Sequence, residues 1–511
     1  MDIPIIQGFA TLFSGWAPVF FALLGTCIGL MAGALPGLSA SAAIALLIPL
    51  TFYMDTLSAL AFIYTISKAA SFGGSIPAIL FNTPGTPQAS ATQLEGYPLT
   101  LQGKQGKALR TAVISSAMGD TFSETLLITS AAYIALYAAK MGPPEYTAVY
   151  FCAFVIIGSV IGKSIVKGLL STLLGILIAL VGFDSITAEE RYVFGVDYLL
   201  EGIALVPVLL GVFVMSEVYV QVEDRLSLLG DKAIAPVSDN PEDSRVTWPE
   251  FKRILPVIAK STGSGTIIGM LPGIGAAVAC FVAYGEARRS SKMKDTWGKG
   301  EIEGVAAAEA ANNATSGANL IPLLTLGVPG SVSAALLAGV MLIHGITIGP
   351  SVFETDGPMI YGLFASGLLC IFTYLVIGYW GSAVVGRMIA MVPAQMIYPF
   401  IFITCFVAAY ALRQALFDLV VMTFFGIVGY VMKKVEFSIP AFIISFILAS
   451  GAERSLRQAM MMDDNGAMIF FERPIALGFF AIGLLTVFLR ARQLRRQEQQ
   501  AKIATESAPA D

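Results

Sequence analysis

Apolar runs of about 20 residues recur along the whole chain, separated by shorter polar segments, and each is long enough to cross a bilayer as a helix. The pattern predicts an all-α polytopic membrane protein with about twelve transmembrane helices. In the first half, crossings are expected near residues 111–138, 148–163, 168–183 and 196–220. In the second half they are expected near residues 361–382, 388–406, 414–432, 437–450 and 474–490.

Two of the apolar runs contain Leu-Pro-Gly, which must interrupt a helix. The stretch "GALPGLSA" at 33–40 is matched by "GMLPGIGA" at 269–276. An Ile-Pro pair and then a Pro-Gly pair follow in both places, in "SIPAILFNTPGT" at 75–86 and "LIPLLTLGVPGS" at 320–331. The shared order and near-constant spacing predict an internal repeat with broken or re-entrant helices.

Positive charge is distributed oppositely in the two copies. The segment after the first Leu-Pro-Gly, "TFYMDTL", has no Lys or Arg, whereas its counterpart "EARRSSKMKDTWGKGE" has five. After the Pro-Gly pairs the bias reverses, because "GYPLTLQGKQGKALR" has three and "GITIGPSVFETDGP" has none. Positive loops stay cytoplasmic, so the copies are predicted to be inverted repeats.

The resulting organisation is a first inverted repeat at 1–220, a cytoplasmic linker at 221–250, a second inverted repeat at 251–490 and a charged cytoplasmic tail at 491–511. The N-terminus is expected in the periplasm and the C-terminus in the cytoplasm. Two segments allow two forms: 57–95 and 304–345 are either single interrupted crossings or a crossing with a re-entrant loop. One loop disagrees with the rule that positively charged loops stay cytoplasmic, because the predicted topology places its Arg454, Arg457 and Arg473 outside.

Composition agrees with a membrane protein, since 56% of the residues are hydrophobic and 13% are charged. The net charge of −4 and the lack of a basic face argue against nucleic acid as a partner. The five cysteines lie in apolar runs without disulfide or metal spacing, so no structural metal is expected. Gly25 and Gly29 have GxxxG spacing, which favours close helix packing.

Broken helices in inverted repeats are typical of secondary transporters, whose helix ends meet near the membrane midplane and bind a substrate and its coupling ion. Free amides at a helix start suit a carboxylate, and free carbonyls at a helix end suit Na⁺. The candidate substrate-binding residues are Pro36, Gly37, Ser39, Ala40, Ser41, Lys68, Asn82, Thr83, Pro84, Gly85, Thr86, Pro272, Gly273, Gly275, Asn313, Pro329, Gly330 and Ser331. The candidate ion-coupling residues are Glu309, Asn312, Thr315, Ser316 and Thr325, with Na⁺ bound only transiently.

Lys68 and Glu309 are ionisable residues in apolar surroundings, and such residues are functional candidates because a buried charge is costly. Lys68 could attract an anionic substrate, and Glu309 could bind a proton or a cation. Alternatively, one or both reach a water interface or form a buried ion pair. Under the repeat alignment Lys68 corresponds to Asn313.

Long stretches of the chain resemble the large membrane subunit of tripartite tricarboxylate transporters (TctA type). They are "GLMAGALPGLSASAAIALLIPLTF", "FGGSIPAILFNTPGTPQASATQLEGYPL", "GTIIGMLPGIGAAVACFVAYGEARR" and "GVAAAEAANNATSGANLIPLLTLGVPGSVSAALLAGVMLIHGI". The resemblance covers about residues 15–490. It implies a bacterial inner-membrane permease that works with a small membrane subunit (TctB type) and a periplasmic solute-binding protein (TctC type). It also implies import of di- and tricarboxylates such as citrate, driven by a Na⁺ or H⁺ gradient. Lys68 departs from the neutral residue expected there.

Three other functions are compatible with parts of the pattern. The same fold could carry another organic anion, such as an aromatic carboxylate. A channel or scaffold subunit without coupled transport would show the same apolar runs. An intramembrane hydrolase would use "GLSAS" and His344, but GxSxG and HExxH are absent from the sequence, and no ATPase motif is present.

Overall fold

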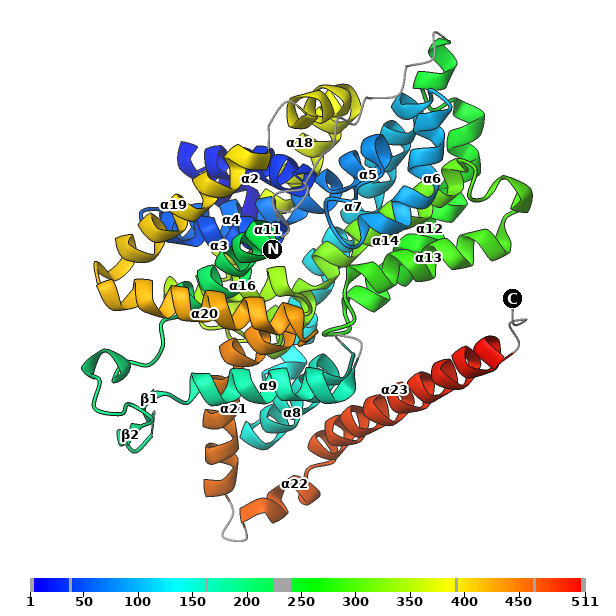
Figure 1. The fold of residues 1–511 in the computed structure, drawn as a ribbon. Coiled ribbons are helices and arrows are strands. Elements are labelled where there is room, and N and C mark those ends of the chain that lie inside the picture. Colours follow the sequence, from blue (N-terminus) through cyan, green and yellow to red (C-terminus); the bar gives the residue numbers. More distant parts are fainter. Residues whose placement is uncertain are drawn as a thin grey trace. The chain divides into compact units, whose positions relative to one another are not determined.

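The computed structural model describes residues 4–35, 39–160, 164–184, 186–223, 240–390, 394–462 and 466–506, which are predominantly helical (Figure 1). The described strands are only two residues long, β1 (Gly182–Phe183) and β2 (Glu190–Arg191), and they pair antiparallel. The predicted all-α class is therefore confirmed. Seven of the described helices are long and apolar enough to cross a membrane.

The chain divides into two compact units. Unit 1 comprises Met1–Ala138 and Ala204–Val431, and unit 2 comprises Ala139–Ile203 and Met432–Asp511. These units do not follow the two sequence halves. The boundaries expected for the repeats, 1–220 and 251–490, remain a prediction, and much of the expected linker at 221–250 lies outside the described residues.

Unit 1 holds every element that carries a predicted site residue. Its first part contains α1 (Pro4–Leu12), α2 (Trp16–Ala34), α3 (Ala40–Thr51), α4 (Thr56–Gly73), α5 (Ser75–Phe81), α6 (Ala89–Leu101) and α7 (Gln105–Ala138). Its middle part contains α10 (Leu205–Leu209), a π-helical stretch (Leu210–Met215), α11 (Ser216–Glu223), a 3-10 turn (Pro241–Ser244), α12 (Trp248–Gly269), α13 (Ala276–Ser290) and a 3-10 turn (Lys294–Thr296). It continues through α14 (Ile302–Ala318), α15 (Leu320–Leu326), α16 (Val332–Ile343), α17 (Val352–Thr355), α18 (Gly357–Ala390), α19 (Ala394–Arg413) and α20 (Leu416–Lys434).

A three-helix module occurs twice in unit 1. The helices α4, α5 and α6 have 18, 7 and 13 residues, and α14, α15 and α16 have 17, 7 and 12. Both seven-residue helices end at a left-handed residue, Asn82 with φ 56° and Gly327 with φ 75°. A Pro-Gly turn follows in each copy. The two segments that the pattern left open are thus a long helix, a short helix, a turn and a third helix.

Glycines allow the long helices of each copy to pack closely. A side chain on Gly29 of α2 would collide with the backbone of Ile66 on α4, and one on Gly265 of α12 would collide with the backbone of Ala311 on α14. The prediction that Gly25 and Gly29 serve helix packing is confirmed, because Gly25 likewise faces Thr65 and Phe62 without room for a side chain. Figure 1 shows α12 and α14 side by side, with α7 against α14.

Several predicted crossings have different bounds in the structure, among them the crossing expected at 388–406, which is α19 (Ala394–Arg413), and the crossing expected at 474–490, which is α23 (Pro474–Glu506). The crossing expected at 196–220 begins only at Leu205, because residues before it form turns in which Gly195 and Gly202 have positive φ. The helix α18 continues to Ala390, beyond the predicted end at 382. The crossing expected at 437–450 is α21 (Ile439–Met461), which extends past the apolar run.

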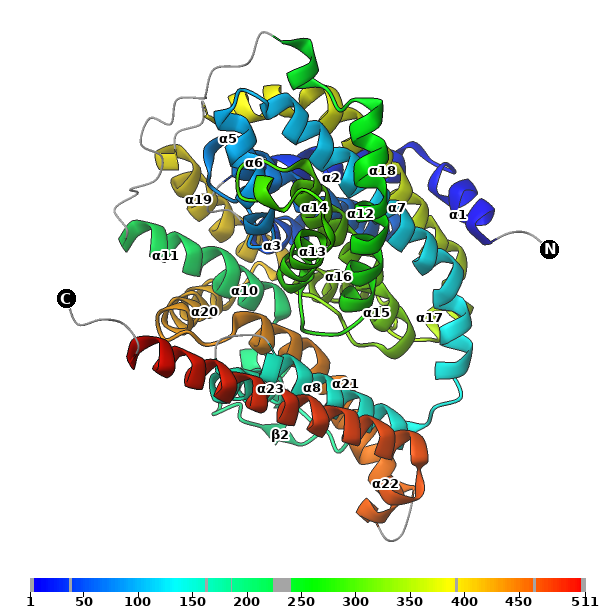
Figure 2. The same cartoon turned by 90° about the vertical axis from the view of Figure 1, so that its right-hand side faces the viewer.

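Unit 2 contains α8 (Pro143–Val160), α9 (Ile165–Ala179), β1, a 3-10 turn (Asp197–Leu199), β2, α21, a 3-10 turn (Gly466–Met468), α22 (Ile469–Glu472) and α23 (Pro474–Glu506). The helix α8 lies beside α21 and α23 (Figure 2).

Two arginines of the loop that disagreed with the charge rule form ion pairs in unit 2. Arg457 pairs with Asp184 at 2.6 Å and with Glu453 at 2.9 Å, and Arg191 pairs with the same two carboxylates. Arg473 lies 3.8 Å from Glu145. Arg457 and Arg473 are thus paired within unit 2, and the orientation of this loop stays a prediction.

Candidate transport site

Within each copy, the segment at Leu-Pro-Gly lies against the segment at the Pro-Gly turn. In the first copy, the Gly85 amide donates to the Gly74 carbonyl at 3.0 Å, and a side chain on Gly85 would collide with the Gly33 carbonyl at the end of α2. In the second copy, the Gly273 amide donates to the Gly330 carbonyl at 3.3 Å. The Leu-Pro-Gly segment and the Pro-Gly turn of one copy therefore form one structural feature. Pro36 and Gly37 lie outside the described residues.

The two copies meet at Glu309, a buried carboxylate on α14. Ser75 at the start of α5 donates to it at 2.5 Å, Ser116 on α7 donates at 2.8 Å, and Thr92 on α6 also donates. The neighbouring Asn312 donates its side-chain amide to the Ser71 carbonyl at 3.0 Å. The junction between α4 and α5 thus contacts the centre of α14.

Oxygen atoms without donors surround this junction. Among the described residues, the side-chain oxygens of Asn312, Asn313 and Thr86 are buried and have no hydrogen-bond partner. Thr86 packs on Gly74, close to the Ser75 that binds Glu309. Buried oxygens of this kind require a donor, an ordered water or a cation. The region around Glu309 therefore offers buried oxygens that a donor, an ordered water or a cation could satisfy.

Lys68 does not present a free charge to a substrate. Its ammonium lies 2.6 Å from Asp120 and 2.7 Å from Glu124, and all three side chains are fully buried. Tyr64 donates its hydroxyl to Glu124 at 2.6 Å, and Tyr374 donates to Asp120 at 3.1 Å. We call these five residues the Lys68 cluster. The structure supports the alternative of a buried ion pair for Lys68 over a substrate-binding cation.

Two serines at the helix breaks act as N-caps. Ser39 accepts the Ala42 amide at 3.1 Å and Ser331 accepts the Ala334 amide at 3.2 Å. Each serine satisfies one of the four amides that a helix start leaves unpaired, so the predicted free amides are reduced by one in each copy. Ser41 stays within hydrogen-bonding distance of Ser39, with 3.1 Å between the hydroxyl oxygens.

Several predicted residues are explained by local backbone geometry. Asn82 caps α5 in the left-handed conformation, and its side chain accepts from Gln93 at 2.6 Å. The hydroxyls of Thr83, Thr315 and Thr325 donate to nearby carbonyls of their own segments.

The remaining predicted residues differ in exposure. Buried positions are Thr86, Gly273, Asn312, Asn313, Pro329 and Gly330. Partly exposed positions, which a solute could reach, are Ala40, Ser41, Thr83, Pro84, Gly85, Pro272, Gly275, Ser316 and Ser331, and Ser39 and Asn82 are exposed.

The carboxylates and hydroxyls that complete these clusters were not predicted from the sequence. Asp120 and Glu124 stand one turn apart in the apolar run "SSAMGDTFSETLL", which is the same signal that singled out Lys68. By contrast, Ser75, Thr92 and Ser116 are ordinary polar residues of helices, and only the packing identifies them.

Loops predicted to share a membrane side are in contact. Gln102, after α6, donates to the Lys299 carbonyl at 2.5 Å. Glu95 on α6 accepts the amides of Gly298 at 2.6 Å, Gly300 at 3.0 Å and Glu301 at 2.8 Å. These segments are the two that carry the excess of positive charge.

The opposite pair of loops also lies close together, because His344 after α16 is adjacent to the backbone of Thr51 at the end of α3. Both segments lack Lys and Arg, and both were predicted to lie on the outer side of the membrane.

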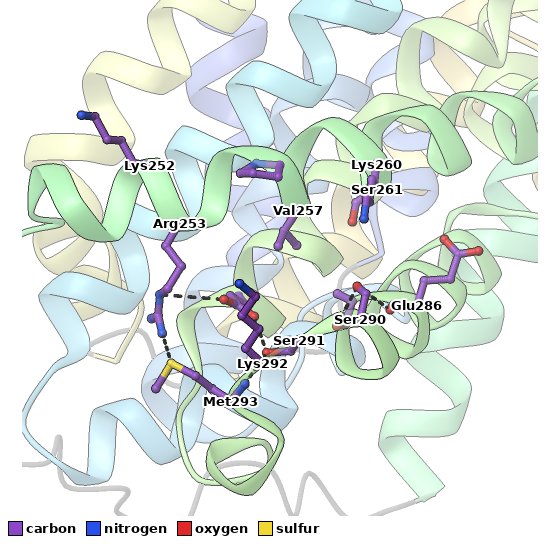
Figure 3. A pocket seen from close by; sticks show the side chains of 13 residues that line it. Lys252, Arg253, Val257, Lys260, Ser261, Glu286, Ser290, Ser291, Lys292 and Met293 are labelled. Atoms are coloured by element: carbon purple, nitrogen blue, oxygen red, sulfur yellow. Dashed lines mark hydrogen bonds and ion pairs between the residues drawn. The ribbon is translucent and has the colours of Figure 1, made fainter.

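A surface pocket of about 480 Å³ lies between α12 and α13 (Figure 3). Its lining includes Lys252, Lys260 and Lys292, together with Arg253, which lies 2.8 Å from Glu301. None of the predicted substrate or ion residues lines this pocket. It is therefore separate from the candidate transport site.

Residues 19–444 match the model of the Tripartite tricarboxylate transporter TctA family. The chain belongs to the TctA family. A protein of Agrobacterium vitis described as "Uncharacterized 52.8 kDa protein in TAR-I ttuC' 3'region" is 32% identical over 477 residues, covering 92% of both chains. A second, "Uncharacterized protein in TAR-II ttuC' 3'region" of the same organism, is 34% identical over 230 residues, covering 44% of this chain and 93% of that protein. No solved structure matches the chain.

Membership of the TctA family establishes the class of protein. TctA proteins are membrane subunits of tripartite transporters and are not enzymes, which removes the intramembrane hydrolase. Together with the membrane-spanning helices, it makes this chain a multi-pass membrane protein.

Proposed function

We propose that this TctA chain is the permease of a binding-protein-dependent secondary transporter that imports di- or tricarboxylates such as citrate across the bacterial inner membrane. The observation that carries the proposal is the helix break of the first copy, which contacts the buried Glu309 on α14 of the second copy through Ser75. Its partners would be a small membrane subunit of the TctB type and a periplasmic solute-binding protein of the TctC type. An ion gradient of Na⁺ or H⁺ would drive uptake.

The substrate would bind at the Pro-Gly and Leu-Pro-Gly segments. Partial exposure of Ser41, Thr83 and Ser331 supports this position, because their hydroxyls are not fully enclosed by the protein. Neutral donors hold a carboxylate reversibly, whereas a bare lysine in the membrane would hold it too tightly. The coupling ion would bind near Glu309, where Asn312 contributes a buried, unpartnered oxygen.

Inverted orientation of the two copies is part of the proposal, with about twelve crossings in all. The contacts that join Gln102 to Lys299 and His344 to Thr51 support it. Reporter fusions test it: a cytoplasmic reporter should be active near Lys104 and Lys294 and silent near Asp55 and Asp356. Activity at matching positions of both copies would mean parallel repeats.

Uptake of radiolabelled citrate tests the function. Cells that lack their own carboxylate carriers would express the permease with its membrane subunit and binding protein. Gly330→Leu should abolish uptake without loss of membrane insertion, because a Cβ there already lies 3.0 Å from the Asn319 side-chain oxygen. The matched control is Gly263→Leu on α12, where a Cβ meets no atom within 4 Å.

Equal uptake by Gly330→Leu and Gly263→Leu would show that the Pro-Gly turn is not part of the substrate site. Uptake of an aromatic carboxylate in place of citrate would keep the mechanism and change the substrate. Transport that an ion gradient does not accelerate would identify an uncoupled channel.

A further inference from the structure

The Lys68 cluster carries more negative than positive charge. One lysine faces two carboxylates, Asp120 and Glu124, and all three side chains have no exposed surface. If both carboxylates are ionised, a net charge of −1 is buried. An uncompensated buried charge costs several kcal/mol, so such a group favours the uptake of one cation or proton.

Neighbouring elements do not supply the missing positive charge. The sequences of α2, α3, α5, α15 and α16 contain no Asp, Glu, Lys, Arg or His. On α18, Tyr374 binds Asp120 and the thiol of Cys370 donates to the Thr65 carbonyl. On α14, Glu309 adds a second negative charge.

The remaining cations on the packed helices are engaged or distant. Lys107 pairs with Glu250 at 2.7 Å, and Arg110 donates to the carbonyls of Ser244 and Tyr379. Both lie at least ten residues before Asp120 on α7, or about 15 Å along the helix. The basic residues of α12 are at or near the surface pocket of Figure 3, and Glu95 on α6 is bound by backbone amides.

One carboxyl oxygen of the cluster is available for a proton. Both oxygens of Asp120 are engaged, by Lys68 and by Tyr374. On Glu124, Oε2 accepts from Lys68 and Tyr64, whereas Oε1 is buried and has no hydrogen-bond partner among the described residues. Glu309 differs, because its two oxygens receive three hydroxyl donors and its ionised form is well satisfied.

We propose that Glu124, in addition to the ion site proposed near Glu309, binds an exchangeable proton that couples transport to the proton gradient, while Lys68 serves as a fixed internal cation. This inference rests on the proposed transport function. A proton from the outer solution would add to Glu124 Oε1, converting the carboxylate to the acid and the cluster from a charge of −1 to zero. Its release to the cytoplasm would restore the carboxylate.

The position of the cluster suits a coupling role. Asp120 lies one turn after Ser116 on α7, and Ser116 binds Glu309. Lys68 lies on α4, which leads directly into the α4–α5 junction. The two helices that carry the cluster's charged residues therefore also reach the candidate ion and substrate site.

Reconstituted vesicles test the coupling. The complete transporter, with labelled citrate as the probe, would be assayed in Na⁺-free buffer with the membrane potential clamped. With one proton per substrate, a gradient of one pH unit supports about tenfold accumulation. We expect Glu124→Gln to lose this accumulation while retaining exchange of labelled for unlabelled citrate, which also reports that the variant is folded.

Two further variants calibrate the result. Glu124→Asp keeps a titratable group and should retain part of the pH-driven accumulation. Glu354→Gln, at an exposed position on α17, should behave as the wild type. Accumulation by Glu124→Gln equal to that of the wild type would overturn the inference, as would wild-type accumulation that requires Na⁺ and ignores pH.

Infrared spectroscopy separates this inference from the proposed function. A pH titration of the purified wild-type protein should show the carbonyl band of a buried carboxylic acid, and the band should be missing from Glu124→Gln. The comparison needs no substrate. If no carboxylate is transported in any assay, the proposed function fails but the titration still decides whether Glu124 binds a proton. An identical band in both proteins would overturn the assignment.

Discussion

Replacing Lys68 with Met removes the cation of the Lys68 cluster with little change of side-chain length. Asp120 and Glu124 then lose their counter-charge in a site without solvent exposure. Breaking a buried ion pair by removing one partner costs about 3–5 kcal/mol, because the remaining charge is uncompensated. Two carboxylates are affected here, but each can take up a proton, so we expect a loss of unfolding free energy within that range.

The triple variant Lys68→Met, Asp120→Asn, Glu124→Gln contains no buried charge at this position. Neutral replacement of a whole buried ion group is often close to neutral in stability, so the triple variant should recover most of the loss. Equilibrium unfolding by SDS in mixed micelles gives the free energies. The control Lys260→Met removes an exposed cation and should change the unfolding free energy by less than about 0.5 kcal/mol.

A Lys68→Met variant that unfolds like the wild type, or a triple variant as unstable as the single one, would show that Lys68 does not neutralise the two buried carboxylates. A substrate-binding lysine would give a different result, with weaker citrate binding and unchanged unfolding in the single variant.

Two further predictions concern packing and pH. Gly29→Ala should lower thermal stability in detergent, because the new methyl group meets the Ile66 backbone, whereas Gly263→Ala should not; equal melting temperatures would contradict the close α2–α4 packing. The Thr187 and Ile186 amides, then Arg457 and Arg191, lower the pKa of Asp184 to about 2. Asp184 therefore stabilises the fold above its ordinary pKa of about 3.9. That contribution is lost as pH falls towards 2, and unfolding of Asp184→Asn should show a weaker dependence on acid pH.

The helices and their breaks could be predicted because they follow from local properties of the chain. Apolar runs and Leu-Pro-Gly or Pro-Gly pairs identify where a helix in a membrane must begin or stop. The crossing expected at 196–220 was wrong at its start, because hydropathy does not register the turns at Gly195 and Gly202 that delay the helix to Leu205.

The partners of buried side chains could not be predicted, since they depend on which helices pack together. Lys68 was identified as a functional candidate, but its carboxylates lie on α7, 52 and 56 residues away. The hydroxyls that bind Glu309 come from three different helices. A single sequence contains no signal that joins Ser75, Thr92 and Ser116 to one carboxylate.

The hydrogen bonds of Glu95 restrict how the permease can move. This buried carboxylate on α6 holds the amides of Gly298, Gly300 and Glu301 and the hydroxyl of Tyr284. If α6 moved away from that loop, the buried Glu95 carboxylate would lose its hydrogen-bond donors. In the proposed transport cycle, the loop before α14 and the helix after the first Pro-Gly turn should therefore move together as one rigid piece.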